Sequence, residues 1–287
     1  MGIRRPAHHS EAVEQGLGDG GGYFPDSEKA GNYAAKAVES DYGKDRVRAV
    51  AHLFAKANVA PAPTVVDFGG GDGSFLRDLA LNAGQIHLID VSPHMLEAAS
   101  VLLDGNELEV LLGSVDQLAN LGDTTADVVL CINTLGYLEA DDQERFFVEA
   151  HRILKPGGKL VIMTGNELLD LYAINSGTSH FFMRNFSSDI SALLVHENHQ
   201  RWLNADRANP LAFGALLHSF GFREEAQSFS QWHTSPPGLA VLEADGDIAR
   251  ARSEARDHGF DANLLAHGER WQALFRCSMF ASLAAKV

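Results

Sequence analysis

The sequence is poor in cysteine and in basic residues, and it has no long apolar run. Only two cysteines occur among the 287 residues, Cys131 and Cys277, each inside a predicted strand. We expect both to be reduced and buried, which favours the cytoplasm. No apolar stretch reaches the roughly 20 residues that a membrane span requires, and the N-terminus lacks the apolar core of a secretory signal. The expectation is a cytoplasmic protein with no membrane partner.

Lysine and arginine are outnumbered by acidic residues, 23 against 38, for a formal net charge of −15. Binding of nucleic acid depends on Lys and Arg neutralising phosphates, so this balance disfavours such a partner. The length suits one large α/β domain with insertions, and no linker divides the chain cleanly in two. A small molecule remains as the expected partner.

Residues 65–76 are the stretch around which the rest of the chain is organised. Two β-branched residues lead into Asp67, glycines follow at 69, 71 and 73, and an apolar periodic run begins at Phe75. This pattern, Asp-x-Gly-x-Gly-x-Gly, predicts a buried strand, a tight turn and the start of a helix. Glycine suits a turn whose backbone must approach a ligand closely.

Further strands and helices alternate along the chain, and seven strands are expected in all. The other six are predicted at 85–90, 108–112, 126–132, 159–164, 224–233 and 273–285. Ser92 and Pro93 are expected to begin the helix after the second strand. Such alternation predicts a doubly wound, mostly parallel seven-stranded sheet, which binds ligands at the carboxyl ends of its strands. The polar residues expected at those ends are Asp67, Asp90, Ser114 and Asn133.

Three segments depart from this alternation. Residues 1–22 are predicted to form a flexible arm, and 23–60 a helical segment that covers the site, with the main domain spanning 61–287. Within that domain, the insertion 165–208 is rich in aromatics and histidines and is expected to act as a lid. A second insertion, 234–270, either completes the pocket or forms a homo-oligomer contact. No metal site is expected.

The motifs together resemble class I S-adenosylmethionine-dependent methyltransferases that act on small molecules. The resemblance rests on four stretches in order, covers 62–164 strongly and 210–285 weakly, and implies a Rossmann-like fold. The stretches are the glycine turn 67–73, Asp90 at the end of the second strand, 126–130 and the Leu-Lys-Pro-Gly-Gly-Lys-Leu turn 154–160. The cofactor implied is S-adenosylmethionine, with S-adenosylhomocysteine as product.

The resemblance also implies which residues contact the cofactor. Asp90 is expected to bind the ribose hydroxyls of the cofactor. Asp67 is expected to act at the cofactor's positive end, and Asn133 to face its sulfonium. The remaining implied contacts are Gly69, Gly71, Gly73, Val91 and Tyr33. The family often has Asp after the glycine that follows the third strand, where this chain has Ser114. Adenine recognition is left open between Ser114, Asp116 and the Val115 backbone.

Methyl transfer from a sulfonium is an in-line displacement, so the enzyme contributes mainly orientation and exclusion of water. A hydroxyl or acidic carbon acceptor benefits from a general base, whereas an unprotonated amine does not. The candidates for such a base are His180, His196, His199 and Tyr33. The residues expected to contact the acceptor are Tyr23, Tyr137, Phe181, Phe182, Arg184 and Trp202.

The sequence thus predicts a methyltransferase acting on a small-molecule acceptor, a specialised natural-product metabolite. One alternative is a nicotinamide-dependent oxidoreductase, which predicts Gly-x-Gly-x-x-Gly, whereas here Gly73 falls two residues after Gly71. The other is a catalytically inactive cofactor-binding or regulatory protein. The identity of the acceptor, the atom methylated, the general base and the oligomeric state are not encoded in any recognisable pattern.

Overall fold

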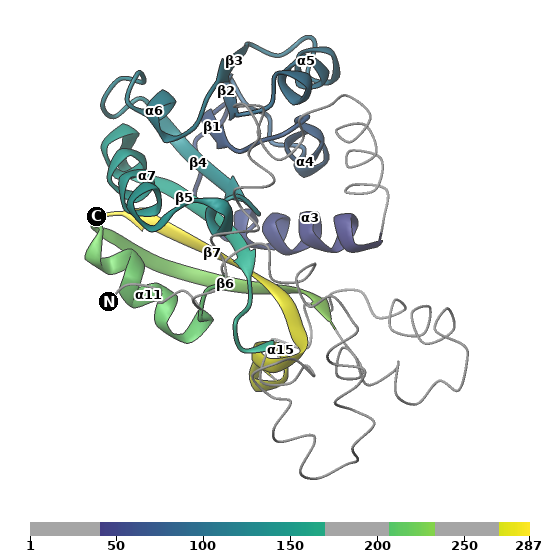
Figure 1. Ribbon diagram of the computed structural model, residues 1–287, viewed down its shortest axis with the longest axis vertical. Helices are drawn as coiled ribbons and strands as arrows, with labels where there is room; N and C mark the ends of the chain where they lie inside the picture. Colours follow the sequence, from purple (N-terminus) through teal and green to yellow (C-terminus); the bar gives the residue numbers. More distant parts are fainter. Residues whose placement is uncertain (1–40, 170–206, 233–269) are drawn as a thin grey trace.

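A seven-stranded sheet forms the centre of the structure (Figure 1). The computed structural model describes residues 41–169, 207–232 and 270–287. The strand order across the sheet is β3-β2-β1-β4-β5-β7-β6. The strands are β1 (Thr64–Phe68), β2 (Gln85–Asp90), β3 (Leu108–Leu112), β4 (Ala126–Ile132), β5 (Leu154–Gly165), β6 (Phe222–Trp232) and β7 (Cys277–Lys286).

The first five strands run parallel to one another, and β7 runs antiparallel to both β5 and β6. The predicted doubly wound, mostly parallel seven-stranded sheet is confirmed. Because β1 pairs with both β2 and β4, the direction in which the chain winds reverses between β1 and β4. A reversal of this kind leaves a crevice outside the carboxyl ends of the strands, where doubly wound sheets bind ligands.

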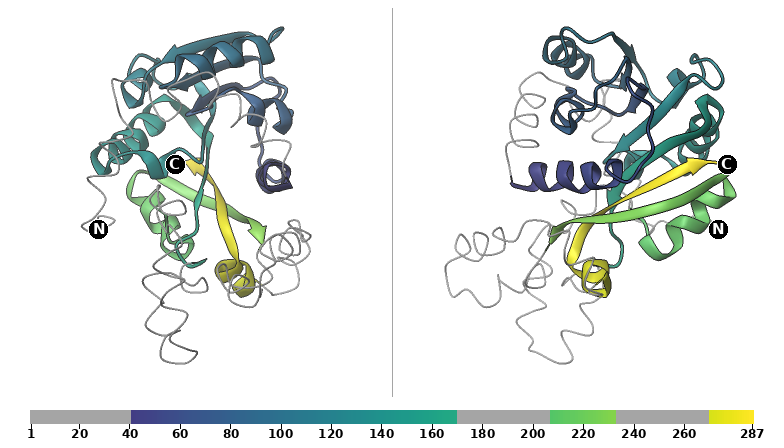
Figure 2. Two further views of the ribbon diagram at one scale, coloured as in Figure 1. Left: turned by 45° about the vertical axis from the view of Figure 1, so that its right-hand side comes forward. Right: turned by 180° about the vertical axis from the view of Figure 1, so that it is seen from behind.

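Helices cover both faces of this sheet (Figures 1 and 2). One face carries α3 (Asp41–Phe54), α4 (Ser74–Leu79) and α5 (Pro93–Leu102), which contribute Leu53, Leu76 and Leu96 to a single buried cluster. The other face carries α6 (Val115–Leu118), α7 (Ala140–Ile153) and α11 (Pro210–Ser219). Two shorter elements are the 3-10 turn η2 (Leu135–Tyr137) and α15 (Arg270–Arg276).

The sequence signals at the start of α5 act as predicted. Ser92 is the N-cap, and its hydroxyl accepts a hydrogen bond from the Met95 N–H at 3.4 Å, while Pro93 occupies the first helical position. Asn209 caps α11 in the same way, accepting from the Leu211 N–H at 3.0 Å. A polar cap followed by proline fixes the direction in which each helix leaves its loop.

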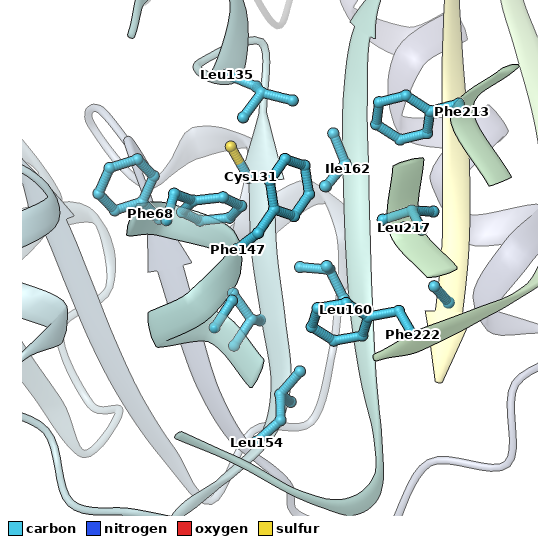
Figure 3. Close-up of a cluster of buried hydrophobic side chains, with 14 of the residues drawn as sticks. Phe68, Cys131, Leu135, Phe147, Leu154, Leu160, Ile162, Phe213, Leu217 and Phe222 are labelled. Atoms are coloured by element: carbon cyan, nitrogen blue, oxygen red, sulfur yellow. The ribbon is translucent and has the colours of Figure 1, made fainter. Parts of the chain in front are cut away.

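Aromatic side chains dominate the core on the α7 face (Figure 3). The Phe146 ring lies 5.0 Å from that of Phe68 and 5.5 Å from that of Phe147, centroid to centroid. Cys131 is fully buried among them, as expected from its place in β4, and Cys277 is buried at the start of β7. This packing joins the strand before the glycine turn to the helix that follows β4.

The last predicted strand begins too early. Residues 270–276 form α15, and β7 starts only at Cys277. The stretch from Ala273 to Ala285 is mostly apolar on both sides of Arg276, so hydrophobicity alone does not separate a buried helix from a buried strand. Alanine, leucine, glutamine and arginine in 270–276 favour the helix.

The segment before the sheet is described from α3 onward. The Ala49 carbonyl accepts a hydrogen bond from Ser228 at 2.8 Å, and Asp45 accepts one from the Gln231 N–H at 2.5 Å. These bonds hold α3 against β6, so this part of the predicted 23–60 segment packs on the sheet. The arm 1–22 and most of both predicted insertions lie outside the described residues. Among the described residues, no helix is both long and apolar enough to cross a membrane.

We predict that Phe146→Ala lowers the free energy of unfolding by about 3–5 kcal/mol, because a fully buried ring would leave a cavity against Phe68 and Phe147. Urea denaturation of the full chain measures the change. Val148→Ala on the same helix is the matched control, since Val148 is 52% exposed and should cost less than about 0.5 kcal/mol. Equal losses in the two variants would contradict this account of the core.

Candidate functional site

The carboxyl ends of β1, β2 and β4 place the predicted cofactor residues along one edge of the sheet. Asp67 pairs in register with Leu88 on β2 and with Leu130 on β4. Asp90 ends β2, and Asn133 directly follows β4, where its backbone N–H donates to the Met163 carbonyl at 2.8 Å. Residues far apart in the chain therefore meet at the point where the winding reverses.

The glycine turn lies between these strand ends. Gly69 has φ +71°, and a Cβ there would lie 2.1 Å from the Thr134 hydroxyl oxygen, so any side chain would collide with the residue after Asn133. Gly71 also has positive φ, at +58°, but a Cβ there would have no atom within 4 Å. The backbone of the turn is thus packed against β4 at Gly69 and open at Gly71, where a ligand could approach it.

Asp90 holds this turn in place. Its two carboxylate oxygens accept hydrogen bonds from the Gly71 N–H at 3.0 Å and the Ser92 N–H at 2.9 Å. Burial raises the pKa of Asp90, and these backbone donors oppose that rise. Each carboxylate oxygen has a second lone pair, so the side chain can also accept from a ligand's hydroxyls.

Asp67 and Asn133 each present a buried oxygen with no hydrogen-bond partner among the described residues. The Asp67 side chain is almost fully buried, and burial together with the negative charge of Asp90 raises its pKa to about 7. Asn133 has φ 58°, a left-handed conformation that is uncommon outside glycine. Unpaired buried acceptors and backbone strain concentrate at functional sites, and two acceptors together call for a ligand that brings donors or positive charge.

The end of β3 supplies the remaining described candidates. Ser114 is the N-cap residue of α6, but its side chain makes no capping hydrogen bond, and Val115 is buried. Asp116 points to solvent and forms an ion pair with Arg145 of α7. Val91 and Tyr137 are 40% and 51% exposed, so their side chains are available for contact.

Nine of the residues predicted for the site lie outside the described residues. They are Tyr23, Tyr33, His180, Phe181, Phe182, Arg184, His196, His199 and Trp202. The acceptor side of the site and the general base therefore stay predictions. In the described part of the chain, no group of three or more His, Cys, Asp or Glu side chains could hold a metal ion.

Sequence reasoning missed two residues that shape the site. The Thr134 hydroxyl lies 3.3 Å from the Gly69 carbonyl, to which it donates, and its side chain fills the space above Gly69. A Cβ at Gly70 would lie 2.7 Å from the Asp67 Oδ2 atom. The run of three glycines signals Gly70, whereas no pattern in the sequence signals Thr134.

Comparison with known proteins assigns this arrangement to a family. Residues 66–162 match the family described as Methyltransferase domain, a range that runs from β1 into β5 and includes the glycine turn, Asp90 and Asn133. Over residues 66–162 the chain carries a methyltransferase domain.

Two curated relatives are similar in sequence to about half of this chain. One is an arsenite methyltransferase of Halobacterium salinarum, 30% identical over 158 residues, which cover 50% of this chain and 39% of that protein. The other is a ubiquinone/menaquinone biosynthesis C-methyltransferase of Bordetella avium, 29% identical over 153 residues, or 48% and 59% of the two chains. The methyltransferase domain thus spans about half the length of the curated relatives it matches.

A solved structure shares the fold over most of its length. It is an S-adenosylmethionine dependent methyltransferase of Mesorhizobium loti, 18% identical, with a TM-score of 0.54. The superposition covers 87% of this chain and 100% of that chain. At this identity the likeness shows the fold of the methyltransferase domain, including the parts of the sheet beyond the family match.

The buried carboxyl of Asp67 predicts a pH dependence of stability. Its folded-state pKa of about 7 lies above the ordinary value of 3.8, so the native state retains a proton that the unfolded chain releases. That contribution is complete below about pH 4 and is lost as the pH rises through about 7. Asp67→Asn removes the titration, so its stability relative to wild type should rise between about pH 4 and 7, by at most about 4 kcal/mol.

Urea denaturation at several pH values measures this difference in the absence of ligand. Asp104→Asn, an exposed position after α5, is the control and should track wild type at every pH. A stability difference between Asp67→Asn and wild type that does not change with pH would contradict the assignment.

Proposed function

We propose that the chain binds S-adenosylmethionine in this site and transfers its methyl group to a small-molecule acceptor. The observation that carries the proposal is the pair of buried, unpartnered oxygens of Asp67 and Asn133 at the winding reversal. The cofactor has an ammonium group with three donors and a positively charged sulfonium. Such a cation complements two acceptors, one of them a carboxyl that ionises near neutral pH.

Different residues of the described part of the chain contact different parts of the cofactor. Asp90 accepts from the ribose hydroxyls, and the open backbone at Gly71 lies beside the methionine part. Ser114 and the Val115 backbone read adenine, because the Asp116 carboxylate is already engaged by Arg145 at the surface. The exposed side chain of Val91 packs against the nucleoside.

The cofactor, when bound, supplies a methyl group that is already activated for displacement. The chain's own residues hold the acceptor in line with that group and exclude water. A hydroxyl or acidic-carbon acceptor also needs its proton removed, and the candidates for this role are His180, His196, His199 and Tyr33. Tyr137, whose side chain is half exposed after β4, is the described candidate for contact with the acceptor.

The acceptor belongs to small-molecule metabolism, as a specialised metabolite. The net charge of −15 is unfavourable for nucleic acid. The two relatives are named for different acceptors, arsenite and a precursor methylated on carbon in ubiquinone/menaquinone biosynthesis. The methyltransferase domain is compatible with chemically different acceptors, so the residues outside it select among them.

One experiment tests the proposal directly. Calorimetry with S-adenosylmethionine and S-adenosylhomocysteine measures cofactor binding, and NADH is the control for a nicotinamide-binding protein. The protein is then incubated with methyl-labelled S-adenosylmethionine and a small-metabolite extract, and mass spectrometry searches for labelled products. A labelled product would support the proposed methyltransferase activity and would identify the acceptor. Cofactor binding without any product favours the inactive binder, and binding of NADH alone would overturn the proposal.

Asp90→Ala should weaken S-adenosylhomocysteine binding about a hundredfold, because the variant loses both the ribose contact and the bond that holds Gly71. Calorimetry measures the affinity, and a thermal melt verifies that the variant is folded. Asp104→Ala is the control at an exposed site and should bind as wild type does. Unchanged affinity in Asp90→Ala would show that the ribose assignment is wrong.

Alanine at His180, His196 and His199 in turn tests the general base. If one of them removes the acceptor's proton, that variant loses about 10²–10⁴-fold in kcat while its affinity for S-adenosylhomocysteine stays within about twofold of wild type. His218, in the last turn of α11, is the control position. Full turnover in all three variants would exclude a lid histidine as the base.

A further inference from the structure

Arg152, in the last turn of α7, binds the main chain at the far end of α6. Its guanidinium donates to the Leu118 carbonyl and to the Leu121 carbonyl, each at 2.9 Å. The same group pairs with Glu149 on its own helix and with Asp123 in the loop after α6. One partly buried side chain thus joins α7 to the whole segment between α6 and β4.

Arg145 lies two helical turns earlier on α7 and binds the first turn of α6 itself. It forms an ion pair with Asp116, the second residue of α6, and another with Asp142 at 2.9 Å. Arginine suits both positions, because its planar group makes several charge-assisted hydrogen bonds in a fixed geometry. The two arginines therefore hold α6 at both ends.

The short helix needs this support. α6 has four residues, Val115–Leu118, and one turn of helix is unstable without tertiary contacts. Burial of Val115 and Leu118 fixes how deeply the turn sits in the core. The Leu118 carbonyl ends α6 and the Leu121 carbonyl lies three residues beyond it, so the two bonds from Arg152 orient the carboxyl end of the turn.

Ser114 joins β3 to the other end of this turn, where its carbonyl accepts a hydrogen bond from the Gln117 N–H at 2.9 Å. Resting on the proposed function, we propose that Arg152 is a positioning residue for adenine recognition: by holding the Leu118 and Leu121 carbonyls, it aims the Ser114 hydroxyl at the adenine 6-amino group. Arg152 itself does not touch the cofactor. Its effect is therefore confined to the nucleoside end, and the Asp67 and Asn133 oxygens are unaffected.

The test compares S-adenosylhomocysteine with its 6-deamino analogue, in which a hydrogen atom replaces the 6-amino group, because the Ser114 hydroxyl could donate to an oxygen placed there but cannot bond to hydrogen. Wild type should prefer the adenosyl ligand in calorimetry. Arg152→Gln should lose about tenfold in affinity for the adenosyl ligand, with a much smaller loss for the 6-deamino analogue. Arg152→Lys, which keeps the charge and donates to fewer carbonyls, should show an intermediate preference.

The ratio of the two affinities separates positioning from general destabilisation. Arg223→Gln is the control, since Arg223 is a 70% exposed arginine that also forms an ion pair, with Glu225 on β6. It should leave the ratio unchanged. Equal weakening of both ligands in the Arg152 variants, or a wild type without preference, would overturn the inference. A wild type that binds neither ligand would instead overturn the proposed function. If Arg152→Gln does not fold, the ratio of the two affinities measured with Arg152→Lys tests the inference instead.

Discussion

The site depends on one carboxylate that holds two segments together. Asp90 ends β2 and accepts from Gly71 in the turn after β1 and from Ser92 at the start of α5. The glycines give the turn its shape but no rigidity, because they have no side chains to pack. Asp90 supplies that rigidity from a neighbouring strand, so one residue both shapes the turn and faces the proposed ligand.

The two faces of the sheet support different parts of the proposed cofactor site. On the α4 and α5 face, the glycine turn and the Ser92 cap define where the methionine and ribose parts would lie. On the α7 face, the aromatic core around Phe146 and the arginines of α7 hold the strand ends and the α6 segment. Each half of the proposed cofactor site is thus supported by a separate packing layer, and the layers meet at β1 and β4.

Features with local signals could be predicted from the sequence. The ends of β2, β3 and β4, the Ser92 cap and the alignment of Asp67, Asp90 and Asn133 at one sheet edge all follow from short patterns. The start of β7 could not, because the residues on both sides of the boundary at Cys277 are mostly apolar. Nor could the Asp116–Arg145 ion pair, which joins residues 29 apart, or the unpartnered oxygens of Asp67 and Asn133. Such features depend on side-chain directions that are set by packing across the whole fold.

The placement of β7 between β5 and β6 has a consequence for the order of folding. β6 precedes β7 in the chain but is joined to the sheet only through it. Strands β1 to β5 can pair as they become available, whereas β6 must wait for residues 277–286. Contacts between distant parts of a chain slow folding. The sheet therefore closes late, and until then neither edge of β6 is paired, whereas in the folded sheet one edge is covered by β7.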